Sequence, residues 1–188
     1  MRGLWRSLPA PHRRWIVLNA LLATAVINLA VNTGIAWLSV KGQAGVPLWA
    51  RPLSKTSTIG DTLGTLFLLP LITCMLCTTA VWRELRTGAL IPLPGAPPYD
   101  RWLADLPAGR LRRGIAFGAI VFLALAPPVT AALAVIDFGT LTEGQFVAFK
   151  TAFAIGLGAI VTPVIALCAM TDRTSRPVIL GVACGQPR

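Results

Sequence analysis

Apolar residues fall into four long runs along the chain, separated by segments rich in arginine, proline and glycine. The runs cover residues 15–38, 60–82, 114–136 and 149–170. A helix needs about 20 apolar residues to cross a hydrocarbon core of about 30 Å, and each run is long enough to do so. The pattern predicts an all-α fold, a polytopic membrane protein in which residues 1–188 form a single bundle of four transmembrane helices.

The composition of the chain supports a membrane location. Of the 188 residues, 55% are hydrophobic and only 13% are charged, whereas a soluble domain carries about 25% charged residues. So few charges cannot cover a water-facing surface, and the composition excludes a disordered chain, a collagen-like chain and a secreted disulfide scaffold. We expect a multi-pass protein of the cell membrane, which in a bacterium is the inner membrane.

The distribution of basic residues predicts an orientation. Thirteen of the 17 lysines and arginines lie before the first run, between the second and third runs, or after the fourth. The positive-inside rule therefore places both termini and the proline- and arginine-rich loop 83–113 in the cytoplasm. The arginines of this loop either only fix the topology or also contact anionic lipid headgroups. The net charge of +10 comes without a nucleic-acid recognition motif, so we expect no nucleic-acid partner.

Five polar residues within the apolar runs are candidates for a binding site: Asn28, Asn32, Asp61, Thr65 and Thr130. A rise of 1.5 Å per residue puts Asn28 near the midplane and the other four toward the outer surface. In one interpretation they join neighbouring helices by hydrogen bonds, each worth about 0.6 kcal/mol. In the other they line a polar cavity that opens to the outer side, with Asp61 at its mouth.

Asp61 follows a helix-start sequence at the outer end of the second run, where Asp137 and Lys150 also lie near the same level. An aspartate in the first helical turn stabilises the positive end of the helix dipole, and Thr58 or Asp61 itself is a candidate cap. The alternative is that the Asp61 carboxylate contacts a cation or a substrate amine.

Residues of catalytic and metal-binding type are scarce. His12 is the only histidine, and Cys74, Cys77 and Cys168 fall inside apolar runs, where small thiols most often serve packing. Intramembrane acid–base chemistry requires carboxylates or histidines within the spans, and their central parts have none. We therefore expect a non-enzymatic protein without a cofactor or bound metal.

Two functions fit this pattern. The first is a small protein of transport or permeation type with a polar site in the outer half of the bundle. The second is an accessory or structural subunit that binds a larger membrane protein complex. We expect membrane lipids as neighbours, and either a homo-oligomer or membership of a larger membrane complex.

Overall fold

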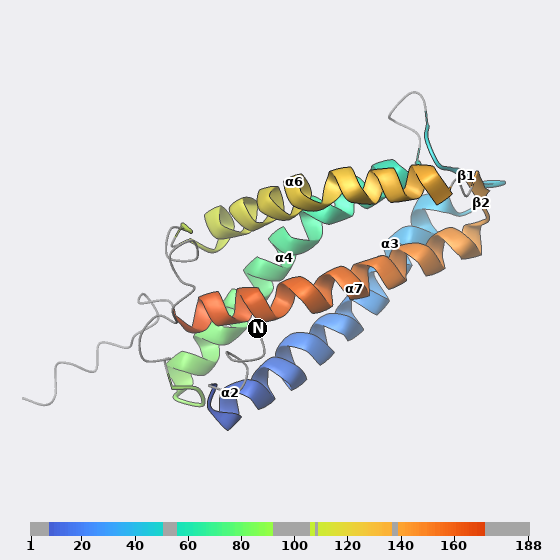
Figure 1. Ribbon diagram of the computed structural model, residues 1–188. Coiled ribbons are helices and arrows are strands. Elements are labelled where there is room, and N and C mark those ends of the chain that lie inside the picture. The colour runs from blue at the N-terminus through green and yellow to red at the C-terminus, as the bar shows by residue number, and fades with distance from the viewer. Residues whose placement is uncertain (1–7, 51–55, 92–105, 108, 137–138, 172–188) are drawn as a thin grey trace, which may run out of the picture.

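A computed structural model describes residues 8–50, 56–91, 106–107, 109–136 and 139–171. Within these ranges the chain is helical apart from turns and two short strands at one end of the bundle (Figure 1). Four helices are long and apolar enough to cross a membrane, Ala10–Val40, Thr58–Thr87, Arg110–Ile136 and Glu143–Met170. The predicted all-α fold with four long apolar helices is therefore confirmed.

The first long helix is built from three consecutive segments. These are α2 (Ala10–Trp15), the π-helical segment η1 (Ile16–Leu22) and α3 (Ala23–Val40). The π-helix is a wider coil with i→i+5 hydrogen bonds, and it changes which side chains share one face.

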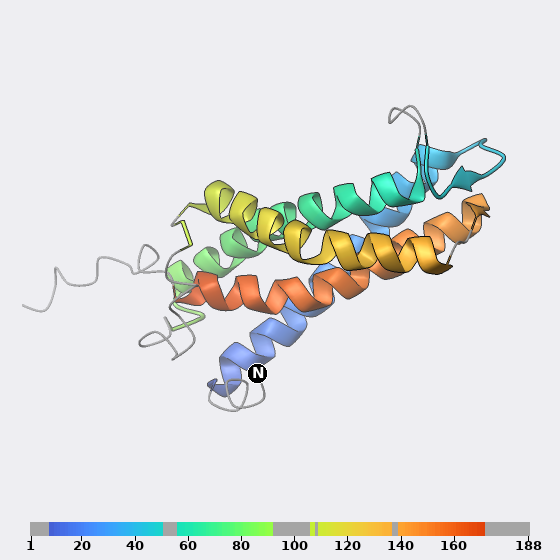
Figure 2. The same cartoon turned by 45° about the horizontal axis from the view of Figure 1, so that its top comes forward.

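Three further long helices and two strands complete the described fold. The helices are α4 (Thr58–Thr87), α6 (Arg110–Ile136) and α7 (Glu143–Met170), and the strands are β1 (Val46–Pro47) and β2 (Thr140–Leu141). Successive long helices run in opposite directions (Figure 2). α2 begins the first long helix and β1 follows its end, so α2 and the two strands lie at opposite ends of the bundle (Figure 1). We call these the α2 end and the strand end.

The helices extend beyond the predicted apolar runs. Arg83 and Arg86 lie in the last turns of α4, and Arg110 begins α6. Arginine is a good helix former, so a helix continues past the point where its apolar run stops. α4 ends only at Thr87 and is capped by Gly88, whose φ of 74° lies in the left-handed region that glycine adopts readily. The loop predicted over 83–113 is correspondingly shorter at both ends.

The cap of α4 differs from the expected one. The Ser57 side chain accepts a hydrogen bond from the backbone N–H of Gly60 at 3.1 Å, so Ser57 is the N-cap and neither Thr58 nor Asp61 is. A cap must precede the helix with extended backbone, and Ser57 meets that requirement with φ −137° and ψ 152°. Asp61 lies in the first turn, as expected.

α4 is at the centre of the packing, in contact with both α6 and α7, while α3 packs against α7. The α4–α6 contact depends on Gly114 and Gly118, four residues apart on one face of α6. A Cβ added to Gly114 would lie 2.8 Å from Leu71 Cδ1, and one added to Gly118 would lie 2.8 Å from the Phe67 carbonyl oxygen. The two backbones are therefore close, as in other small-residue contacts between membrane helices.

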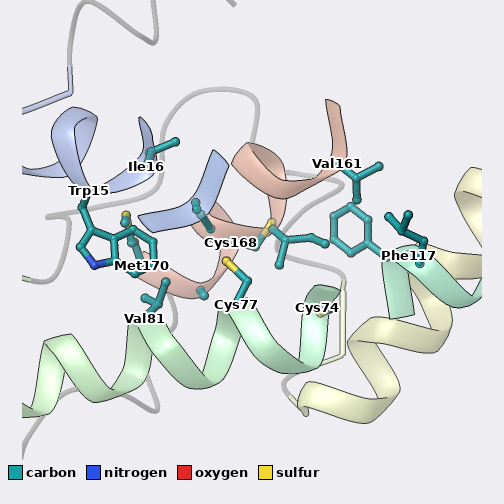
Figure 3. Packing of buried hydrophobic residues seen from close by; sticks show 14 of the residues in the cluster. Trp15, Ile16, Cys74, Cys77, Val81, Phe117, Val161, Cys168 and Met170 are labelled. Atoms are coloured by element: carbon teal, nitrogen blue, oxygen red, sulfur yellow. The ribbon is translucent and has the colours of Figure 1, made fainter. Parts of the chain in front are cut away.

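The largest apolar cluster draws on α2, η1, α4, α6 and α7. Cys74, Cys77 and Cys168 are all buried in it. Figure 3 shows Cys77 and Cys168 among apolar side chains that include Trp15 and Val81. These three cysteines occupy packing positions, as the sequence analysis predicted.

The two strands link the segment that follows α3 to the segment that precedes α7. β1 and β2 pair antiparallel, with Val46 opposite Leu141. Val46 and Leu141 also join a small apolar cluster with Ala36 and Val40 from α3 and Phe146 from α7. The turns of α3 and α7 at the strand end are thus held together beside the polar residues described next.

Candidate functional site

A groove of about 430 Å³ lies between the first long helix and α4. It runs from Trp15 and Ala80 near the α2 end to Ile35 and Asp61 near the strand end. α7 packs against both α3 and α4, and its Lys150 also lines the groove. Most of the lining side chains are apolar, and the polar ones are distributed along its length.

Four of the five predicted site residues line this groove: Asn28, Asn32, Asp61 and Thr65. The fifth, Thr130, lies on α6 and is not among the lining residues that the structure describes. The physical reason is that α6 packs mainly against α4, and depth in the bilayer alone does not tell which helices face each other. The structure brings the other four together.

Asp61 pairs with Lys150. The Lys150 Nζ donates to Asp61 Oδ1 at 2.5 Å. The Lys150 side chain is 6% exposed and the Asp61 side chain is 19% exposed. The cation beside Asp61 therefore comes from α7 of the same chain. Sequence analysis placed both residues at one level but did not pair them, although opposite charges at equal depth in adjoining spans are a usable signal.

The two asparagines bond to each other along one helix face. Asn32 Nδ2 donates to Asn28 Oδ1 at 3.1 Å. Asn28 is 8% exposed, and its Nδ2 has no hydrogen-bond partner among the described residues. A Cβ added to Gly158 of α7 would lie 2.7 Å from that nitrogen. Asn28 thus keeps one unused donor in a largely buried position.

Hydroxyl groups near the strand end are mostly used within the fold. Thr65 Oγ1 donates to the Asp61 backbone oxygen at 2.9 Å, a bond within α4. Thr33 Oγ1 and Thr151 Oγ1 are 2.9 Å apart and join α3 to α7. This threonine pair is a hydrogen bond between spans of the kind that the sequence analysis considered for the asparagines, and it occurs at positions that were not predicted.

Asn19 is a lining residue that sequence reasoning missed. It belongs to the π-helical segment, five residues before Thr24, which also lines the groove. Asn19 begins a row of lining residues that are four positions apart and continue with Ala23 and Ile27, which is ordinary helical spacing. The sequence analysis took its candidates from the midplane and the outer half of the runs, and Asn19 lies nearer the α2 end.

The groove offers amides, hydroxyls, one carboxylate and one ammonium group. Such a set can bind and orient a ligand. Within the described ranges, no three residues of the types His, Cys, Asp and Glu come together as candidate metal ligands. Comparisons with protein-family models, curated proteins and solved structures find no match to this chain.

Proposed function

We propose that this chain is a small, non-enzymatic integral membrane protein of transport type, which binds its ligand in the groove between α3 and α4. The polar site lies in the half of the groove nearer the strand end, around Asn28, Asn32, Asp61 and Lys150. The observation that carries the proposal is the groove itself, with these polar groups in its wall.

The length of the groove supports a transport role. The lining residues Trp15 and Ile35 are 20 positions apart on the first helix, which corresponds to about 30 Å. That distance equals the thickness of a hydrocarbon core. Polar side chains occur at several levels, from Asn19 through Asn28 to Asn32. A ligand that crosses a bilayer along a protein requires polar contacts at successive depths.

The proposed orientation puts the strand end outside and the α2 end in the cytoplasm. Arg83 and Arg86 on α4 and Arg110 on α6 lie at the α2 end, and positive-inside bias favours that end for the cytoplasm. The cell membrane is then the location of the protein, and in a bacterium the inner membrane.

The accessory-subunit alternative rests on α6. This helix packs mainly against α4 and leaves Leu123 and Val135 72% and 85% exposed. A span of a larger complex, or of a second copy, would cover this face in that alternative. Lipid also covers an apolar helix face, and an accessory role based on α6 does not account for the polar side chains along the groove. The transport role is therefore preferred.

A plug in the groove tests the proposal. Gly64 lines the groove, and a Cβ added there meets nothing within 4 Å, so the side chain of Gly64→Leu starts in open space and adds bulk to the groove. Gly156 on α7 is exposed, is equally free of neighbours and does not line the groove. Gly156→Leu is therefore the matched control.

The measurement is complementation of a phenotype of cells that lack the protein, alongside expression level and melting temperature in detergent. We expect Gly64→Leu to fold like the wild type and to fail in complementation, while Gly156→Leu complements fully. Full complementation by both variants would remove the groove from the function and give first place to the accessory role.

A further inference from the structure

We infer that the ligand of this groove is a zwitterionic membrane lipid, with one hydrocarbon chain along the groove and the polar head at the Asp61–Lys150 end. This inference rests on the proposed function and names its substrate class. It depends on the volume of the groove, on its rim, and on the charge at its polar end.

The volume of the groove suits a small or chain-like ligand. It is about 430 Å³, within the range of about 300–1,000 Å³ that is typical of ligand pockets. A transmembrane helix of a partner, about 10–12 Å across and about 30 Å long, occupies roughly 2,400–3,400 Å³. Such a helix is too large to fill this groove, whereas a single hydrocarbon chain is small enough.

The rim of the groove is apolar on both sides. Ile27 and Val31 of α3 are 48% and 50% exposed, and Leu68 and Ile72 of α4 are 52% and 54% exposed. All four lie in the middle parts of apolar helices, at the depth of the lipid chains. A ligand reaches the groove sideways from the bilayer, and this route favours a lipid over a water-soluble solute.

The ion pair at the polar end of the groove has no net charge. Asp61 and Lys150 neutralise each other, and both side chains are largely buried. A head with a single net charge would leave one charge without compensation in a poorly solvated site, which is strongly unfavourable. A zwitterionic head brings one charge of each sign, so the head and the ion pair together leave no charge uncompensated.

Native mass spectrometry of the purified full-length chain in mild detergent tests the inference. The probes are a phosphatidylethanolamine, which is zwitterionic, and a phosphatidylglycerol with the same chains, which is anionic. Each is added to the wild type, to Gly64→Leu and to the control Gly156→Leu. The quantity compared is the binding that Gly64→Leu removes, because lipid bound elsewhere on the surface is common to all three proteins.

We expect one phosphatidylethanolamine per wild-type chain, a loss of about tenfold in occupancy in Gly64→Leu, and wild-type occupancy in Gly156→Leu. Equal binding of this lipid by all three proteins would overturn the inference, as would plug-sensitive binding of phosphatidylglycerol at the same or higher occupancy. If Gly64→Leu abolishes complementation and leaves lipid binding unchanged, the lipid inference fails and the proposed function stands. If it abolishes lipid binding and still complements, the proposed function fails.

Discussion

Asp61 and Lys150 form an ion pair with little exposure, 19% and 6% for the two side chains. Asp61→Asn leaves the Lys150 ammonium without a counter-charge, and we expect this to cost about 2–3 kcal/mol of stability. The melting temperature in detergent should fall for Asp61→Asn. It should recover in the double variant Asp61→Asn with Lys150→Met, which has no unpaired charge.

Glu143→Gln is the control for this pair, because it removes a carboxylate from the first turn of α7 and leaves the Asp61–Lys150 contact intact. Its melting temperature should stay close to that of the wild type. If Asp61→Asn is as stable as Glu143→Gln, the ion pair contributes nothing to the fold.

Asn32 separates a structural from a functional role. Asn32→Leu removes the hydrogen bond to Asn28 Oδ1, which is worth about 0.6 kcal/mol between membrane residues, and adds apolar bulk to the groove. We expect a small change in melting temperature and a clear loss of complementation. Activity that falls only in proportion to the amount of folded protein would assign Asn32 to stability alone.

At the residue scale the sequence pointed to four residues that line the groove. Asn28, Asn32, Asp61 and Thr65 were found because polar residues are rare in apolar runs and their depth follows from their position. Lys150 was counted for orientation and not paired with Asp61. Thr130 was grouped with the others by depth, although depth does not determine which helices are neighbours.

At the scale of the helices, the contact between α4 and α6 depends on small residues. A Cβ added to Gly118 would lie 2.8 Å from the Phe67 carbonyl oxygen, and this backbone atom cannot move aside alone. We expect Gly118→Ala to separate α4 from α6 and to lower the melting temperature.

Gly156→Ala is the matched control, since a Cβ at Gly156 meets nothing within 4 Å. Alanine is the better helix former by about 1 kcal/mol, so this variant should be as stable as the wild type or more so. Equal melting temperatures for the two alanine variants would contradict the close packing of α4 and α6.

The helices themselves were predictable, because an apolar run of about 20 residues has few alternatives to a spanning helix. Their ends were not, since arginines such as Arg83 and Arg86 extend α4 beyond its apolar part. The π-helical segment was not predicted either. It includes Asn19, which lines the groove, and no residue pattern in the sequence distinguishes it from regular α-helix.

For the whole molecule, the orientation is the property that the distribution of arginines predicts. Single cysteines replace Gln43, Gly144 or Ala89, all exposed, in a background without native cysteines. An impermeant thiol reagent added to intact cells should label positions 43 and 144, at the strand end, and leave position 89 unlabelled. Labelling of position 89 alone would invert the orientation.

Occupancy of the groove in cells is the central claim, and site-specific photo-crosslinking measures it most directly. A photoreactive amino acid replaces Leu68 on the groove rim or Leu123 on the outer face of α6, which are 52% and 72% exposed. After irradiation, the mass of the intact protein is measured. The account predicts one discrete adduct at position 68 that Gly64→Leu abolishes, and a heterogeneous set of lipid adducts at position 123. The same heterogeneous adducts at both positions, unchanged by Gly64→Leu, would contradict it.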